Sequence, residues 1–197
     1  HGPTGLRRIA SRIHRLTQIL AIGLQSKGIK LDNETYFDTL TLAVSEDEAM
    51  QIVERASEAN INLRLDRIAS HQTIGVSLDE CTSEAEIAAL WQVIIGKESA
   101  SLSVADIDKQ IESGAVGPVV PTTLERKTVY LTHPVFNRFH SETDMMRYLK
   151  RLENKDISLT HSMIALGSCT MKLNAAAEMI PVTWPEFSKI HTFAPDT

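Results

Sequence analysis

A short stretch rich in glycine and proline, residues 114–121, constrains the organisation of this chain more than any other feature. Gly114, Gly117, Pro118 and Pro121 oppose both helix and strand, so regular structure must stop there. Before the stretch, apolar residues recur with regular periods, and after it most of that regularity is lost. The sequence therefore predicts a domain over residues 1–113, a linker over 114–127, and a second part over 128–197.

The first part shows three helical patterns, each with a start signal. One begins near Pro3 and stops at Gly28, and the other two follow the capping boxes Ser45/Glu48 and Ser83/Glu86. A shorter helix is predicted after Ser103. The predicted inner faces are Leu6, Ile9, Ile13, Leu16, Leu20 and Leu24; Ala49, Ile52, Val53 and Ala56; Ile87, Leu90, Trp91 and Ile94; and Val104, Ile107 and Ile111. Four arginines, Arg7, Arg8, Arg12 and Arg15, interrupt the first face and are interpreted as solvated.

Alternation of apolar and polar residues predicts three strands, over residues 36–44, 61–65 and 74–78. The gap between the last two is short, which favours an antiparallel pair. The order helix, strand, helix, strand, strand, helix predicts an α+β sandwich with helices packed on a small sheet.

The second part contains one convincing helix, capped by Ser141 with Asp144 at the third position. Its apolar stripe is formed by Met145, Leu149 and Leu152. From residue 156 onward the pattern dissolves, and prolines alternate with aromatic residues. This composition predicts an extended arm that lies on another surface.

Composition excludes several classes of function. The net charge of -5 disfavours nucleic acid and anionic membrane partners, and no apolar run approaches the ~18 residues of a membrane span. The seven histidines show no H-x-x-x-H spacing, so no metal site is predicted. Neither a G-x-S-x-G elbow nor a nucleotide-binding glycine motif occurs. Cys81 and Cys169 are expected to be free thiols.

The densest group of reactive side chains lies just after Gly167. It contains a thiol, two hydroxyls, an ammonium and an amide, and no periodicity runs through it; the residues are Ser168, Cys169, Thr170, Lys172 and Asn174. Cys169 is either a reactive thiol activated by Lys172 or an inert buried one. Lys172 could itself form a Schiff base. The spacing alone leaves these readings open.

The segment GSCTMKLN, residues 167–174, closely resembles a segment of the glycine cleavage system P-protein family. Residues 131–148 (LTHPVFNRFHSETDMMRY) and 183–187 (TWPEF) are similar to the same family, and weaker similarity is found at residues 1–6, 36–40 and 74–80. The resemblance implies a fold-type I pyridoxal-phosphate enzyme built of two homologous halves. This chain would be an internal fragment across their junction, with the small α/β-sandwich domain of the first half followed by a helix and arm of the second.

The resemblance also implies an activity. Members of the family are oxidoreductases that release carbon dioxide from glycine and transfer the aminomethyl group to the lipoyl arm of H-protein. Their Schiff-base lysine lies downstream of Thr197, so Lys172 is not that residue, and the fragment is expected to be inactive and to bind no cofactor. Ser168, Cys169, Thr170, Lys172 and Asn174 become candidates for the glycine pocket. Expected partners are H-protein, the other half of the enzyme and a second subunit, in the bacterial cytoplasm or, in a eukaryote, the mitochondrion.

A second hypothesis comes from another class of protein. The order of helices and strands also suits a small-molecule-binding regulatory α+β module with an interaction arm. The long motif of residues 131–148 argues against it, because a plain arm needs no such specific sequence.

Overall fold

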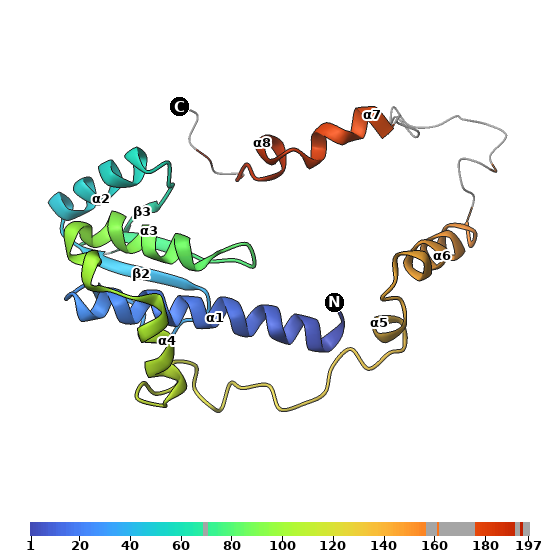
Figure 1. Ribbon diagram of the computed structural model, residues 1–197, viewed down its shortest axis with the longest axis horizontal. Helices are drawn as coiled ribbons and strands as arrows, with labels where there is room; N and C mark the ends of the chain where they lie inside the picture. The colour runs from blue at the N-terminus through green and yellow to red at the C-terminus, as the bar shows by residue number, and fades with distance from the viewer. Residues whose placement is uncertain (69–70, 157–160, 162–175, 192–193, 195–197) are drawn as a thin grey trace. The chain divides into compact units, whose positions relative to one another are not determined.

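The computed structural model describes residues 1–68, 71–156, 161, 176–191 and 194 (Figure 1). It divides into two units, His1–Tyr130 and Leu131–Thr197. The first unit holds the sheet and the core, and the second is made of short helices.

Four α-helices build the first unit: α1 (Gly2–Ser26), α2 (Glu46–Glu58), α3 (Glu84–Ile95) and α4 (Val104–Glu112). Both predicted capping boxes are present, since the Ser45 and Ser83 side chains accept from the backbone N–H of Glu48 and Glu86 while those carboxylates accept in return. Gly28 follows α1 with φ +83° and Gly96 ends α3 with φ +62°. A 3-10 helix, η1 (Gly96–Ser101), joins α3 to α4.

The sheet has four strands in the order β1-β2-β4-β3, and every neighbouring pair is antiparallel. They are β1 (Lys30–Leu31), β2 (Thr39–Val44), β3 (Arg64–Ile68) and β4 (His71–Ser77). The predicted antiparallel pairing of the second and third strands is confirmed as β3 with β4. The sequence missed β1, which is too short to show alternation.

The core lies where α1, α2 and α3 pack with the inner faces of β2 and β4. Leu40 and Leu42 pair with Val76 and Ile74, and all four side chains are fully or almost fully buried. Trp91 of α3 is 1% exposed and donates its indole N–H to the carbonyl of Leu20, 3.1 Å away. The fold class is therefore α+β with a small antiparallel sheet, as predicted.

Three predicted inner-face residues are wrong. Leu6 is 42% exposed on α1, Val53 is 38% exposed on α2, and Leu65 is 50% exposed on β3, where every residue is exposed. β3 is an edge strand that no helix covers. The alternation of apolar and polar residues distinguishes its two faces, but neither face is buried. The strand expected over residues 36–44 begins only at Thr39.

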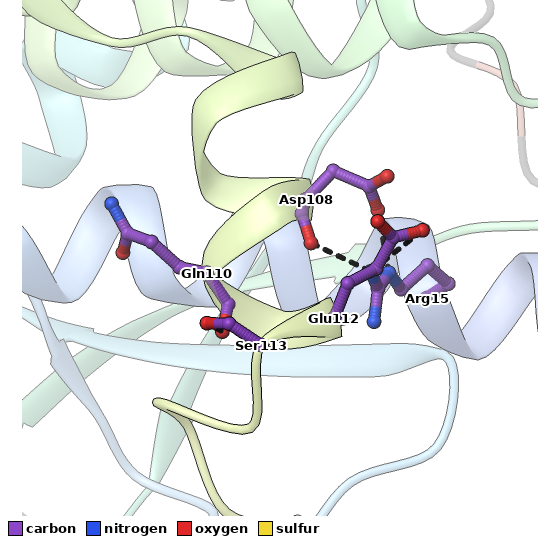
Figure 2. Close-up of polar contacts among 5 residues, drawn as sticks. All are labelled: Arg15, Asp108, Gln110, Glu112 and Ser113. Atoms are coloured by element: carbon purple, nitrogen blue, oxygen red, sulfur yellow. Dashed lines mark hydrogen bonds and ion pairs between the residues drawn. The ribbon is translucent and has the colours of Figure 1, made fainter.

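The interpretation of the α1 arginines as solvated is wrong for Arg15, which is partly buried, whereas Arg12 is exposed as predicted. Arg15 donates from Nε to Oδ1 of Asp108 at 2.5 Å and from Nη2 to the Asp108 carbonyl at 2.7 Å, and Glu112 approaches to 3.9 Å (Figure 2). This contact fastens α4 to α1. Arg12 donates to the carbonyls of Glu80 and Thr82. Each guanidinium thus fixes a segment distant in sequence against the helix.

The second unit contains α5 (Val135–Arg138), α6 (Glu142–Glu153), α7 (Ala176–Met179), η2 (Ile180–Thr183) and α8 (Pro185–Ser188). Ser141 caps α6 as predicted. No residue described in this unit is buried, and Met145, Leu149 and Leu152 of the α6 stripe are 40–56% exposed. The prediction of an extended arm is wrong for residues 176–188, because Pro181 and Pro185 stand in the first turns of η2 and α8, where proline is tolerated.

No helix in the described part of the chain combines the length and apolar character needed to cross a bilayer.

Candidate functional site

The five residues that the sequence nominates for a substrate pocket lie outside the described residues. Ser168, Cys169, Thr170, Lys172 and Asn174 all fall in the range 162–175. Their assignment therefore stays a prediction.

The described residues form neither a metal site nor a buried-lysine site. Within these ranges no three His, Cys, Asp or Glu side chains come together as metal ligands. A Schiff-base lysine needs a desolvated position that lowers its pKa, and none of the described lysines is buried. The described part of the chain therefore does not fit a covalent pyridoxal-phosphate site.

A hollow in the first unit, which we name the α1 groove, runs between the N-terminal half of α1 and residues 118–130, and its volume is about 800 Å³. α1 contributes one side of it, and the returning chain contributes the other. The lining residues are Leu6, Arg7, Ala10, Ser11, His14, Gln18, Phe37, Pro118, Val120, Thr122, Leu124, Glu125, Arg126 and Tyr130.

A polar stripe of α1 forms one side of the α1 groove. Arg7, Ser11, His14 and Gln18 are spaced by four, three and four residues, which places them on one helix face. Gln18 is only 8% exposed, yet no hydrogen bond joins its side chain to any described residue. The amide N and O keep some solvent access, since neither is among the fully buried unpaired atoms of the described residues.

His14 is held in one orientation at the centre of the polar stripe. Its Nδ1 lies 2.8 Å from the carbonyl of Phe37, so Nδ1 carries the proton that this acceptor requires. The imidazole also stacks on the Phe37 ring, with 5.2 Å between centroids and 10° between planes. Nε2 is the ring nitrogen left for other partners.

The opposite side is mainly apolar and is anchored at one end. The Tyr130 hydroxyl donates to the carbonyl of Pro3 at 2.6 Å, which ties residues 118–130 back to the start of α1. The Arg126 guanidinium lies 5.5 Å from the centroid of the Tyr130 ring. Leu124 is 75% exposed at the rim. The sequence analysis predicted no special role for His14 and a solvated position for Arg7. The spacing of Arg7, Ser11, His14 and Gln18 was nevertheless a signal for a polar helix face.

Two pKa shifts are resolved, and neither residue lines the α1 groove. Burial raises the pKa of the Tyr36 hydroxyl. Hydrogen bonds from the backbone and side chain of Ser45 lower the pKa of the Glu48 carboxyl. Both shifts therefore report on the fold.

Comparisons with known proteins agree on one family. The sequence model described as Glycine cleavage system P-protein matches residues 1–94. Proteins named glycine dehydrogenase (decarboxylating) from Shewanella woodyi, Shewanella sediminis and Salmonella newport are 54%, 56% and 52% identical. Each of these matches covers 99% of this chain and 20% of the relative.

Among solved structures, the serine palmitoyltransferase of Sphingomonas wittichii aligns with a TM-score of 0.40 and 18% identity, covering 47% of this chain and 25% of that one. The sequence matches carry the assignment: the chain belongs to the glycine cleavage system P-protein family, and it spans about a fifth of the length of the relatives that it matches.

Proposed function

We propose that this chain is part of a glycine decarboxylase, the oxidoreductase that releases carbon dioxide from glycine and passes the aminomethyl group to the lipoyl arm of H-protein. The observation that carries the proposal is 51–56% identity, over nearly all of this chain, to proteins named glycine dehydrogenase (decarboxylating). Identity at this level usually accompanies a shared reaction, so the name of the relatives is a strong guide.

Within such an enzyme the chain would supply support and not the covalent centre. Residues 1–113 would form a small domain of the first half, residues 114–127 the linker, and residues 128–197 the opening of the second half. Because the described residues do not fit a Schiff-base site, pyridoxal phosphate, which supplies an electron sink for decarboxylation, would be held by residues outside them.

The exposed apolar side chains of the second unit support its association with other parts of the enzyme. Met145, Leu149 and Leu152 share one face of α6, while Trp184 and Phe187 are 49% and 61% exposed. Fully burying a side chain of this size stabilises a protein by about 1.5–3 kcal/mol. The second unit alone leaves these side chains partly exposed and so gains only part of that free energy. We propose that the other half of the enzyme or a second subunit covers them.

Residues 168–174 would contribute to the glycine pocket. Ser168 and Thr170 offer hydroxyl donors, Lys172 a positive charge and Asn174 an amide, the groups that recognise a small carboxylate. Cys169 adds a thiol whose reactivity depends on Lys172. The proposal assigns these residues to substrate binding, not to covalent catalysis.

A chimera tests the proposal. The corresponding segment of the Shewanella woodyi relative is replaced by this chain, and carbon dioxide release from carboxyl-labelled glycine is measured with H-protein present. We expect activity within about tenfold of the unaltered relative, since a tenfold change corresponds to only about 1.4 kcal/mol. A folded chimera that binds pyridoxal phosphate but releases no carbon dioxide would contradict the proposal.

Two variants of the active chimera test the pocket assignment. Ser168→Ala and Thr170→Ala should each lower glycine turnover roughly tenfold or more, because a hydrogen bond to a charged group contributes about 1.5–3 kcal/mol. Ser57→Ala, at an exposed position on α2, is the matched control and should leave turnover unchanged. Normal turnover with a lowered melting temperature in both pocket variants would make the segment structural.

A further inference from the structure

We propose that the α1 groove binds a small organic anion with an apolar body. Four observations carry this inference: the amide of Gln18 without a protein partner, the free nitrogen of His14, the positive charge of the lining, and the apolar opposite side. None of them depends on the proposed decarboxylase activity. Small-molecule binding, which the sequence predicts as an alternative function of the α+β module, is thus proposed as a second property of the same chain.

Gln18 gives the first argument. It is more than nine-tenths buried, it lines the α1 groove, and it has no hydrogen-bond partner in the described ranges. Its amide atoms are not fully buried, so they remain open to a partner from the groove. A ligand in the α1 groove can therefore bond to this amide in place of water. The amide offers two donors and one acceptor to it.

His14 and Ser11 extend this recognition along the helix. The Nδ1 of His14 is bonded to the Phe37 carbonyl, so Nε2 is the ring nitrogen left for a ligand in the groove that His14 lines. The next groove-lining position on the same face is Ser11, whose hydroxyl both donates and accepts. A ligand that lies along α1 can therefore reach several polar groups within three turns of the helix.

The charge of the lining favours an anion. Arg7 and Arg126 each bring a guanidinium, while Glu125 is the single carboxylate among the lining residues. The whole chain has a net charge of -5, so this hollow is locally positive on an acidic protein. Guanidinium groups bind carboxylate, sulfonate and phosphate oxygens through paired N–H donors.

The opposite side sets the rest of the ligand. Val120, Leu124 and Tyr130 offer apolar contact, and Phe37, 47% exposed, adds an aromatic face. The volume of about 800 Å³ lies in the range of small-molecule sites, whereas a bare inorganic anion would leave most of it empty. The ligand therefore combines an anionic head with an aliphatic or aromatic body.

The probe for this site is anilinonaphthalene sulfonate, which joins a sulfonate to an aromatic body and gains fluorescence in apolar surroundings. We expect saturable binding to the full chain, with one site that is displaced by phenylpropanoate or phenyl phosphate. The uncharged phenylpropanamide should compete at least about tenfold less well, because it lacks the charge that the two guanidinium groups recognise. The relative strength of the two anions distinguishes a carboxylate ligand from a phosphate ligand.

Three variants test where on the chain the probe binds. Leu124→Asp, at a 75% exposed position that tolerates the change, should weaken the probe at least about tenfold by adding a like charge to the groove. Gln18→Leu should weaken it by a similar factor through loss of the amide. Met145→Asp, on the exposed apolar face of α6, is the matched control and should change affinity less than about twofold. Because Leu124 is largely exposed, its variant keeps the test valid even if Gln18→Leu destabilises the fold.

Several results would overturn the proposal. Equal binding by the Leu124→Asp chain and the unaltered chain would show that the probe binds elsewhere, and loss of binding in Met145→Asp would place it on α6. Equal competition by phenylpropanamide would show that binding does not require an anionic group. Binding to this chain but not to the active chimera would mean that a polypeptide segment of the longer enzyme occupies the α1 groove. Failure of the chimera to release carbon dioxide, with the probe still bound, would affect only the decarboxylase proposal.

Discussion

Gly23 of α1 should tolerate no side chain. An added Cβ would lie 2.6 Å from Cζ2 of the Trp91 indole, where ordinary van der Waals contact begins at 3.4 Å. The indole cannot move away freely, because it is 1% exposed and its N–H is bonded to the Leu20 carbonyl. Gly23→Ala should therefore destabilise the first unit, although alanine is the better helix former.

The expected size follows from three terms. Replacing an interior helical glycine by alanine gains about 1 kcal/mol. Overpacking a well-filled core costs about 1–3 kcal/mol, and displacing the indole so that its N–H loses its acceptor costs about 1–3 kcal/mol more. Because the steric overlap is deep, the overpacking cost should lie in the upper part of its range. The free energy of unfolding should fall by about 2–5 kcal/mol.

Urea unfolding followed by Trp91 fluorescence measures this change. Trp184→Phe is introduced first, so that the signal comes from Trp91 alone. Gly117→Ala is the matched control, since nothing lies within 4 Å of its added Cβ, and it should be neutral or slightly stabilising. In a Trp91→Phe background, with unfolding followed by circular dichroism because no tryptophan signal is left, the cost of Gly23→Ala should shrink by at least about 1 kcal/mol, since the smaller ring leaves room. An unfolding free energy equal to that of the unaltered chain would refute the reasoning.

Three further predictions concern contacts outside the core. Arg15→Met should lower the unfolding free energy by about 1–2 kcal/mol in urea titrations, because Asp108 loses two hydrogen bonds at a partly exposed site, and an unchanged midpoint would contradict this. Ser83→Ala should cost about 1 kcal/mol by the same measurement, and a cost near zero would argue against the cap. The pKa of Glu48 is lowered in the folded chain, so its contribution to stability is present above the unfolded pKa, near its usual 4.5, and is lost as pH falls through the folded pKa. The stability difference between the unaltered chain and Glu48→Gln should therefore be largest near neutral pH and shrink in acid; a difference that grows in acid would reverse the assigned sign.

Local features of the fold could be predicted from the sequence because their partners are close in the chain. Ser45 and Glu48 are three residues apart, so their reciprocal bonds depend on one turn of helix. Leu65 shows the opposite case, since alternation indicates a face but not whether another element covers it. Arg15 was misread for the same reason: Asp108 is 93 residues away.

The α1 groove could not be predicted for a related reason. Its floor is a helix face that the sequence does reveal, but its other side is the chain that returns at residues 118–130. The burial of Gln18 is a product of tertiary packing, and no local pattern gives it.

The uneven packing of α1 has a consequence for its motions. Its buried residues all lie between Leu16 and Leu24, while the preceding turns hold no buried residue. Amide protons of the buried turns should exchange with solvent only when the whole unit unfolds, whereas those before Ile13 should exchange through local opening. α1 is thus a single continuous helix whose two segments differ in the free energy of local opening, and Arg7 and Ser11 lie on the less stable segment. An anion that bridges Arg7 and Gln18 would join the two segments, and slowed exchange in the first turns would record its arrival.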